Sequence, residues 1–317
     1  MANKNLTAAK NAKNDEFYTQ LTDIEKELTH YREHFKDKIV FCNCDDPTYS
    51  NFWKYFHLNF EFLGLKKLIA THFDAEKPTY KLEYMGGDDL NVEAGVVTPL
   101  TQNGDFRSSE CIELLKEADI VVTNPPFSLF RQYVAQLMEY GKKFVIIGNM
   151  NAITYKEVFP LIKSNQIWYG PSISSGDRKF GVPDYYPLNA AGCGIDENGQ
   201  RYIRIKGVRW FTNLDHKKRH EPIDLVEKYS PEKYPKYDNY DAIEVSKTLD
   251  IPIDYDGVMG VPISFLDKYC PEQFEIVNAN DYRTNPNVPI KAHGLIKDKD
   301  GTVAGKTKYA RILIRRK

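Results

Sequence analysis

Four residues directly after an apolar run have the composition of a binding site for a planar amine. Ile120–Thr123 is typical of a short buried strand, and Asn124-Pro125-Pro126-Phe127 follows it at once. Because two successive prolines continue neither a helix nor a central strand, they predict a rigid extended loop. This loop can offer the Asn124 side-chain oxygen and the Pro125 carbonyl to the hydrogens of an exocyclic amine, with Phe127 stacking on the substrate ring. The simpler alternative is a proline-rich turn with an asparagine cap, which the strand context disfavours.

Acidic residues follow two other predicted strands, Lys38–Cys42 and Lys67–Phe73. The first strand runs into Asn43-Cys44-Asp45-Asp46-Pro47, and Asp74 follows the second. Carboxylates in these positions can receive an ammonium group or, by analogy with dinucleotide-binding folds, ribose hydroxyls. On spacing alone, a turn that caps the next helix explains Asp45 and Asp46 equally well, and a solvated loop acid is the alternative for Asp74.

A second catalytic pattern is present in His30-Tyr-Arg-Glu33-His34, which matches the inverted zinc-peptidase signature H-x-x-E-H. The sequence shows no clear third ligand, and an exposed helix end rich in charged residues is the simpler interpretation. The five cysteines form no Cys-x-x-Cys pair and indicate no disulfide framework. We therefore expect no metal site.

The elements that must position these residues alternate between strand and helix. Helices are predicted over 22–34, 50–60, 109–117, 128–140 and 156–163, the first with Thr22 as N-cap and Glu25 completing a capping box. Strands are predicted over 38–42, 67–73, 119–123, 143–147 and 166–169, with a hairpin around Gly86-Gly87. Near-continuous apolar strands between helices indicate a parallel sheet covered on both faces, which binds ligands beyond the carboxyl ends of its strands.

After Gly170 this alternation stops, and we place a domain boundary near residue 170. The clearest later strands are 208–211 and 311–315. Residues 1–14, rich in Lys, Asn and Ala, predict a mobile N-terminal arm. The chain has no apolar run of the ~18 residues needed to span a membrane, and its start lacks the apolar core of a signal peptide, so we expect a cytoplasmic protein with no membrane partner.

Positive charge gathers locally in a chain of 317 residues whose formal net charge is −1. Residues 201–220 and 291–317 are rich in Lys and Arg, which favours either local contacts to phosphates or a solvated charged face. Basic and aromatic side chains occur together in the first segment, as they do on nucleic-acid-binding surfaces. We therefore expect DNA contacts from Arg204, Lys206, Arg209 and Trp210, the alternative being an amphipathic strand with its aromatic rings in the core.

The Asn-Pro-Pro-Phe loop resembles the catalytic motif of S-adenosylmethionine-dependent methyltransferases that act on amino groups, chiefly adenine N6 in DNA. Further segments resemble the EcoRI-type adenine-specific DNA methyltransferases: Asp15–Thr19, Cys42–Pro47, Gly104–Ser109, Lys143–Tyr155 and Gly207–Asp215. The resemblance covers most of residues 15–170 and continues into the second half.

This resemblance implies an α/β fold, with a Rossmann-like methyltransferase sheet in residues 15–170 and a C-terminal α+β region in 171–317 that recognises the DNA target. It implies S-adenosyl-L-methionine as the cofactor and site-specific methylation of adenine N6 in double-stranded DNA after base flipping. The implied catalytic residues are Asn124, Pro125, Pro126 and Phe127. The residues implied to bind the cofactor are Phe17, Tyr18, Thr19, Asn43, Asp45, Asp46, Asp74, Asp105, Phe106 and Asn124.

The resemblance also implies a restriction-modification system, with a cognate endonuclease that acts on the same site without a stable complex, and a monomeric enzyme. GAATTC is the first DNA site to test. One departure is the absence of a Gly-rich turn after the first strand, where Asn43–Pro47 stands instead. This departure makes a catalytically inert DNA-binding relative one alternative. Methylation of RNA adenine or of a protein glutamine is another, since both amines suit the same pocket.

Overall fold

The computed structural model describes residues 17–44, 46–189, 191–278, 295–296, 302–304, 306–307 and 310–317. The chain forms two compact units, one of Met1–Met150 with Ser172–Asp215 and one of Asn151–Pro171 with His216–Lys317. The predicted boundary near residue 170 is therefore corrected, because the chain returns to the first unit after Pro171. The return is stabilised by strand pairing between β12 (Val208–Thr212) and β7 (Lys143–Asn149). The predicted arm, residues 1–14, lies outside the described residues.

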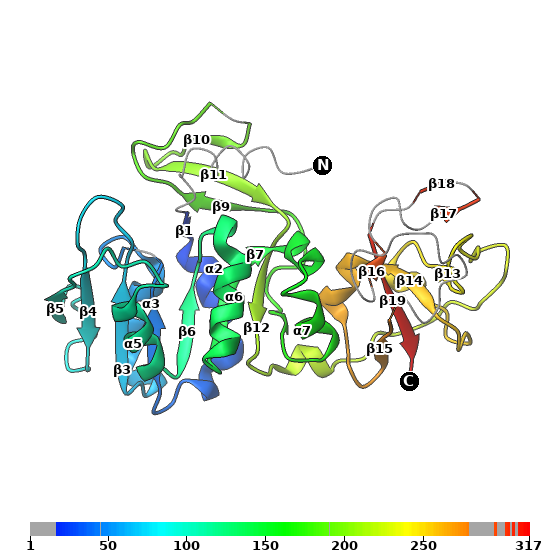
Figure 1. Ribbon diagram of the computed structural model, residues 1–317, viewed down its shortest axis with the longest axis horizontal. Helices are drawn as coiled ribbons and strands as arrows, with labels where there is room; N and C mark the ends of the chain where they lie inside the picture. Colours follow the sequence, from blue (N-terminus) through cyan, green and yellow to red (C-terminus); the bar gives the residue numbers. More distant parts are fainter. Residues whose placement is uncertain are drawn as a thin grey trace. The chain divides into compact units, whose positions relative to one another are not determined.

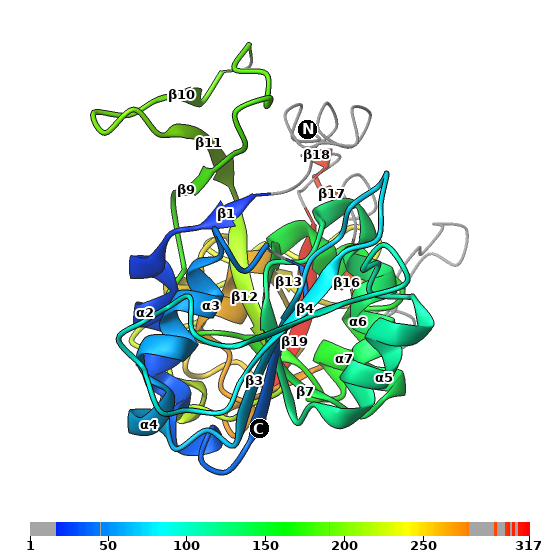
Figure 2. The same ribbon diagram turned by 90° about the vertical axis from the view of Figure 1, so that its left-hand side faces the viewer.

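The large sheet of the first unit has parallel strands at its centre (Figures 1 and 2). Its order is β5-β4-β3-β2-β6-β7-β12, in which β3, β2, β6 and β7 are parallel and the flanking strands antiparallel. The bounds not yet given are β2 Ile39–Cys42, β3 Lys67–Thr71, β4 Tyr80–Tyr84, β5 Val96–Pro99 and β6 Ile120–Thr123. All four residues of β2 and of β6 are buried, which explains their near-continuous apolar sequences. The α/β class is confirmed.

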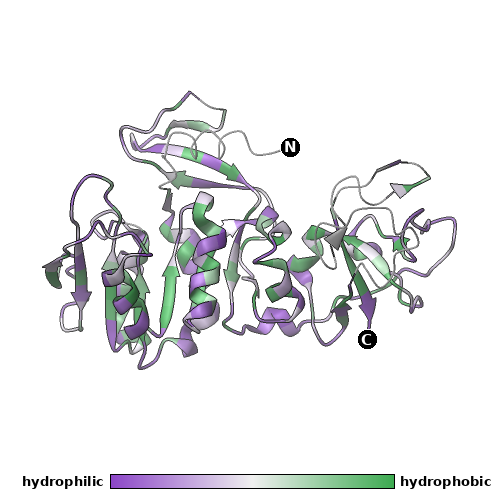
Figure 3. Ribbon diagram, in the orientation of Figure 1, coloured by the Kyte–Doolittle hydropathy of each residue, from purple (hydrophilic) through white to green (hydrophobic). Residues whose placement is uncertain are grey.

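Helices cover this sheet on both faces. Figure 2 shows α2, α3 and α4 on one face and α5 and α6 on the other. Apolar residues recur along one side of each longer helix, so that side packs on the sheet while charged residues face outward (Figure 3). The helices are α2 Leu21–Leu28, α3 Asn51–Leu58, α4 Phe60–Leu63, α5 Ser109–Glu117 and α6 Phe130–Glu139.

The ends of these helices partly follow the predictions. Ser50 and Ser108 cap α3 and α5 through their hydroxyl oxygens. The capping box at Thr22 is wrong: α2 begins at Leu21, because the Gln20 carbonyl already accepts from the backbone N–H groups of the first turn. The predicted helix 22–34 also ends early, and Thr29–His34 continues as a 3-10 helix (η1).

A smaller antiparallel sheet, β1-β9-β11-β10, completes the first unit. Its strands are β1 Tyr18–Thr19, β9 Asp177–Gly181, β10 Cys193–Ile195 and β11 Arg201–Lys206. Strand β11 passes directly into β12 through Gly207, whose φ of 72° is the left-handed conformation that glycine tolerates. Because Val208 pairs with Asn149 at the end of β7, the small sheet stands at the carboxyl ends of the parallel strands (Figure 1).

The second unit is built mainly of short strands. A sheet of order β13-β14-β19-β15, with β16 also paired to β19, forms its core, and β17 pairs with β18. The strands are β8 Trp168–Tyr169, β13 Ile243–Glu244, β14 Met259–Pro262, β15 Phe274–Ile276, β16 Leu295–Ile296, β17 Thr302–Val303, β18 Lys306–Thr307 and β19 Arg311–Arg316. The buried carboxylate of Glu244 pairs with Arg311 at 2.7 Å and joins β13 to β19.

Helices contribute less to this unit than predicted. Its α-helix is α7, Phe159–Lys163, which starts later than the predicted residue 156. Among the described residues of 171–317 the helical segments are 3-10 turns, η4 Lys217–His220, η5 Thr248–Asp250 and η6 Ile263–Lys268, so this region is β-rich rather than α+β. Frequent prolines shorten the elements here. None of the described helices is long and apolar enough to cross a membrane.

Candidate active site

Asn124 lies directly after β6 with its amide buried at the carboxyl edge of the large sheet. Its side-chain nitrogen donates to the Phe17 carbonyl at 2.6 Å, which fixes the orientation of the amide. Its Oδ1 is buried and has no hydrogen-bond partner within the described part of the chain. Leaving a buried acceptor unpaired costs ~1–3 kcal/mol, so this oxygen is a ready acceptor for a donor that a ligand would bring.

The loop after Asn124 is extended, as its two prolines predict. Pro126 has φ −53° and ψ 122°, and its carbonyl accepts from the backbone N–H of Leu129 as the 3-10 turn η2 (Phe127–Leu129) begins. The Phe127 ring is half-buried, with its centroid 5.8 Å from that of Phe17 and 6.4 Å from that of Phe180. Packing against these rings holds Phe127 beside Asn124.

Residues 17–19 lie beside the same loop. Phe17 is buried in the core, and β1 pairs with β9 through Tyr18 and Thr19. The hydroxyl of Thr19 is buried without a hydrogen-bond partner among the described residues, and its carbonyl accepts from the side chain of Asn51 at 2.7 Å. The structure therefore brings a second unsatisfied polar atom to this edge of the sheet.

Asn43 and Phe106 meet on the side chain of Tyr133, which comes from α6. The Tyr133 hydroxyl donates to Asn43 Oδ1, and the Phe106 ring lies edge-on to the Tyr133 ring at 5.0 Å. Burial raises the pKa of Tyr133 well above its ordinary value, so this phenol stays a hydrogen-bond donor. Asn43 thus positions the end of β2 through Tyr133.

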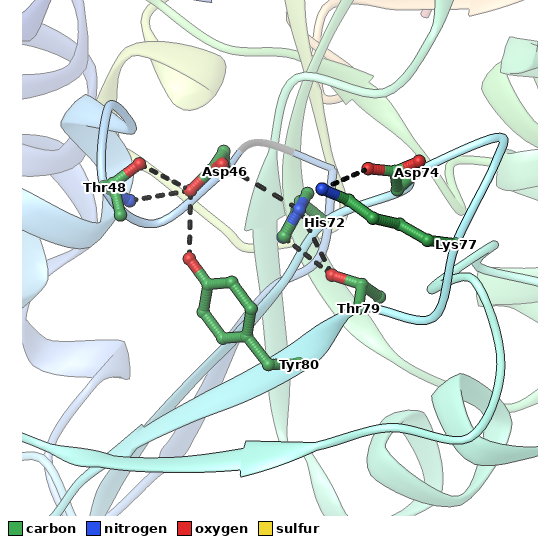
Figure 4. A network of polar contacts seen from close by, with 7 residues as sticks. All are labelled: Asp46, Thr48, His72, Asp74, Lys77, Thr79 and Tyr80. Carbon is green, nitrogen blue, oxygen red and sulfur yellow. Dashed lines mark hydrogen bonds and ion pairs between the residues drawn. The ribbon is translucent and has the colours of Figure 1, made fainter.

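Asp46 caps its own turn, which is the alternative that spacing left open. Its Oδ1 accepts from the backbone N–H of Thr48 at 2.9 Å, from the Thr48 hydroxyl at 2.7 Å and from the Tyr80 hydroxyl at 3.1 Å (Figure 4). Burial and the Asp46 carboxylate together raise the pKa of Tyr80 to about 12. Asp45 lies outside the described residues.

Asp74 and Asp105 reach the same edge from neighbouring loops. The backbone N–H of Asp74 donates to the Asn103 carbonyl at 2.9 Å, which joins the two loops. The pKa of Asp74 is lowered chiefly by the hydrogen bond from the Glu76 backbone N–H, and that of Asp105 chiefly by hydrogen bonds from Arg107. The Arg107 guanidinium contacts both oxygens of Asp105, at 2.8 and 2.6 Å. Both carboxylates are therefore ionised at neutral pH.

The side chains of the basic strand β11 alternate between a buried face and an exposed face. Arg204 and Lys206 are exposed, whereas Ile203 and Ile205 are fully buried. The rings and cations of this outer face contact one another: the Lys179 ammonium lies 4.8 Å and the Arg204 guanidinium 5.8 Å from the centroid of the Tyr202 ring. We call these four side chains, Lys179, Tyr202, Arg204 and Lys206, the β9–β11 strip.

Arg209 and Trp210 occupy a different environment, and the expectation that they contact DNA is corrected. Arg209 is 3% exposed and donates to the Val208 and Ser174 carbonyls at 2.8 and 2.7 Å. Trp210 is fully buried, edge-on to Phe52. The reason is that β12 pairs with β7 in the large sheet and all five of its residues are buried, which places the aromatic ring in the core.

Comparisons with known proteins identify the family of this chain. The family model described as adenine-specific methyltransferase EcoRI matches residues 5–317. The chain belongs to this family. Among curated proteins, it is 52% identical to the type II methyltransferase M.EcoRI of Escherichia coli, over 99% of this chain and 97% of the relative.

Two further similar proteins come from mycoplasmas. The identity is 41% to the type II methyltransferase M.MpnI of Mycoplasma pneumoniae, over 98% of this chain and 97% of the relative. It is 39% to the type II methyltransferase M.MgeORF184P of Mycoplasma genitalium, over 97% of each chain. No solved structure gives a significant match. The predicted family and its class of activity, a DNA adenine methyltransferase, are confirmed.

The zinc-peptidase alternative finds no support in this methyltransferase. His30 and His34 lie on the 3-10 helix η1, whose three residues per turn place positions i and i+4 on different faces. A ring nitrogen of His34 lies 3.0 Å from the Asp215 carbonyl oxygen. Within the described ranges, no group of three or more His, Cys, Asp or Glu side chains is arranged to hold a metal ion.

Sequence reasoning missed Phe180, Tyr133 and His72 as parts of the site. Phe180 comes from β9, beyond the boundary predicted near residue 170, and Tyr133 was indistinguishable from other apolar positions of its helix. His72 carried a signal that could have been used: it is an imidazole at the carboxyl end of an apolar strand, two residues before Asp74.

Proposed function

We propose that this family member transfers the methyl group of S-adenosyl-L-methionine to adenine N6 at a specific site in double-stranded DNA, as the modification enzyme of a restriction-modification system. The observation that supports the proposal most strongly is the buried Oδ1 of Asn124, which has no hydrogen-bond partner among the described residues. The hydrogen bond from the Asn124 side-chain nitrogen to the Phe17 carbonyl holds this oxygen in place. This oxygen accepts one hydrogen of the adenine amine.

The chemistry follows from the electronic structure of adenine. The N6 lone pair is delocalised into the ring, which makes the amine a poor nucleophile. Hydrogen bonds from its two N–H groups to Asn124 Oδ1 and the Pro125 carbonyl favour the tetrahedral geometry that localises the lone pair. The attack needs no titratable general base. S-adenosylmethionine, when bound, would supply the electrophilic methyl group: its sulfur–methyl bond would break as the N6–methyl bond forms, S-adenosylhomocysteine would leave, and the methylated amine would then lose one of its protons.

The residues at the strand ends suit this cofactor. Asp74 and Asp105 are held ionised and can receive the ribose hydroxyls and the nitrogen donors of the ligand's adenine ring. Phe17 and Phe106 contribute apolar surface, and the unpartnered Thr19 hydroxyl offers a further hydrogen bond. Because Asp46 Oδ1 is occupied by its turn, we assign the ammonium group to Asp45 or to Asp46 Oδ2.

The target base must leave the duplex to reach a buried acceptor, and stacking on Phe127 offsets part of the unstacking cost. We assign the DNA backbone near this base to Arg204 and Lys206, joined by Lys179 and Tyr202 of the β9–β11 strip. The strip lies at the same end of the parallel strands as Asn124. Residues 216–317 are assigned the remaining target contacts. We expect a monomer, and a cognate endonuclease that shares the site without forming a stable complex.

The test is methyl transfer from radiolabelled S-adenosylmethionine to duplex DNA, RNA and protein in parallel reactions. We expect label in duplex DNA that contains GAATTC, recovered as N6-methyladenine after digestion, and much less label in a scrambled duplex. Label confined to RNA or protein would overturn the assigned substrate. The absence of label in all three would identify an inert DNA-binding relative.

A further inference from the structure

Three loops with residues assigned to the cofactor meet around one histidine, His72, at the end of β3. They are the turn after β2 that contains Asp46, the segment after β3 that contains Asp74, and the loop that contains Asp105. No motif of the sequence analysis included His72, and the methyl-transfer chemistry does not use it.

The side chain of His72 connects the first two loops (Figure 4). Its Nε2 lies 3.8 Å from Oδ2 of Asp46, the carboxylate oxygen that the turn leaves available. The Thr79 hydroxyl lies 3.0 Å from Nδ1 and 3.1 Å from Nε2, and the Tyr80 ring packs edge-on at 5.0 Å between centroids. The side chain is 17% exposed, so these contacts largely fix the ring.

The backbone of His72 contacts the third loop, which contains Gly104 and Asp105. Gly104 has a φ of 73°, and a Cβ atom at this position would lie 1.9 Å from the His72 carbonyl oxygen. Only glycine permits the backbone at this position to come so close to the His72 carbonyl. Asp105 is the next residue in the chain, so this contact positions its loop. The hydrogen bond from the Asp74 N–H to the Asn103 carbonyl closes the same junction.

We propose that His72 is a positioning residue for the cofactor and makes the affinity for S-adenosylmethionine dependent on pH near neutrality. The inference rests on the proposed use of this cofactor. When the imidazole is neutral, it orders the three loops without adding charge. When it is protonated, it forms an ion pair with Asp46 and places a positive charge among the groups that receive a cationic ligand.

The neighbouring titratable groups support assigning this dependence to the histidine. The side chains facing it are Asp46, Asp74, Lys77 and Tyr80, with Asp105 beyond Gly104. The pKa values of Asp74 and Asp105 are lowered and that of Tyr80 is raised to about 12, so these three keep their charge states between about pH 5.5 and pH 8. Imidazoles in general change charge within this range.

The experiment measures equilibrium binding of two ligands to the full-length enzyme between about pH 5.5 and pH 8. S-adenosylmethionine carries a sulfonium cation, and the demethylated product S-adenosylhomocysteine has the same groups without that charge. On acidification we expect the Kd of S-adenosylmethionine to rise about five-fold, and that of S-adenosylhomocysteine to rise less, from the interaction of one added charge at a few ångströms in a solvated site.

Two variants separate charge from structure. His72→Gln should weaken binding of both ligands roughly three- to ten-fold at pH 8, the equivalent of one hydrogen bond, and should remove the difference between their pH profiles. Tyr80→Phe deletes only the hydroxyl that contacts Asp46, so it should weaken binding less and keep the pH profile. His34→Gln, which removes an imidazole near the opposite ends of the strands, is the matched control and should resemble wild type.

Three results would overturn this inference: equal pH dependence of both ligands in the wild-type enzyme, an unchanged pH profile in His72→Gln, or the same loss in His34→Gln. If His72→Gln unfolds, the two-ligand comparison in wild type and Tyr80→Phe still decides the matter. If the wild-type enzyme binds neither ligand at any pH, the proposed function itself fails.

Discussion

The carboxyl edge of the large sheet and the outer face of the β9–β11 strip use polar groups in opposite ways. At the edge, Asn124 and Thr19 are buried, and each keeps one oxygen unpaired among the described residues. On the strip, the cations are exposed or half-exposed and pair with acids, Arg204 with Asp177 at 3.5 Å and Lys179 with Asp196. The first arrangement suits one short hydrogen bond in a low dielectric, and the second suits contacts to charge in water. Substitutions in the two regions should therefore differ in their effects on turnover, affinity and salt dependence.

Asn124→Ala should have the largest effect on turnover. Removing the acceptor should lower kcat by ~10²–10³ or more, as for other polar groups that act on the reacting centre, with little change in S-adenosylmethionine binding. Asn213→Ala is the matched control, because the Asn213 amide also bonds to the backbone, to the Phe144 N–H and the Lys142 carbonyl, but it lies at the opposite end of the sheet and has no unpaired oxygen to offer a ligand. The control should lower the melting temperature and leave kcat unchanged. Equal kcat losses in the two variants would contradict the assignment.

Trp210→Ala should act on stability. The ring is fully buried, so its removal should lower the free energy of unfolding by ~3–5 kcal/mol, measured by denaturant unfolding. The salt slope of DNA binding by the folded fraction should stay that of wild type. A normal melting curve together with an altered salt dependence of DNA binding would show that Trp210 contacts DNA.

Phe127→Ala tests whether this half-buried ring also stacks on the target base. Loss of a stacking platform should weaken the complex with cognate DNA by ~1–3 kcal/mol, measured by equilibrium binding with S-adenosylhomocysteine present. Phe180→Ala removes a neighbouring ring of the same cluster and should mainly lower stability. If both variants weaken DNA binding equally, Phe127 acts only through packing.

Arg204→Ala and Lys206→Ala should have the smallest effects and the most characteristic ones. Each lost phosphate contact should weaken binding to every duplex and reduce the slope of log K against log salt by roughly one unit. Arg209→Ala is the control, because its guanidinium is buried against carbonyls of the first unit. A strip whose variants keep the wild-type affinity and salt slope would be only a solvated face.

The central parallel strands were predictable because each is a compact apolar run. Asn124 and Asp74 were predicted as site residues because they follow two of these strands, and they stay predictions. The prediction that Arg209 and Trp210 contact DNA was wrong for a physical reason. The strands β9, β10 and β11 of the small sheet lie between β7 and β12 in the chain, so no local sequence pattern indicates that β12 pairs with β7. A second long-range pairing, of β1 with β9, brings Phe180 to Phe17. Asp46 could not be assigned from sequence, because a capping turn and a ligand site require the same residue type.

The hydrogen bond from the target amine to Asn124 is tested most directly by a double-mutant cycle between enzyme and DNA. Binding is measured for wild type and Asn124→Ala, each with a GAATTC duplex and with one in which purine replaces the target adenine and removes the amine. The weaker pairing of purine affects both enzymes alike and cancels in the cycle. We expect a coupling of ~1–3 kcal/mol, because wild type alone loses a buried hydrogen bond with the purine duplex. A coupling near zero, with both enzymes discriminating adenine from purine equally, would contradict the assignment of Asn124 as the acceptor.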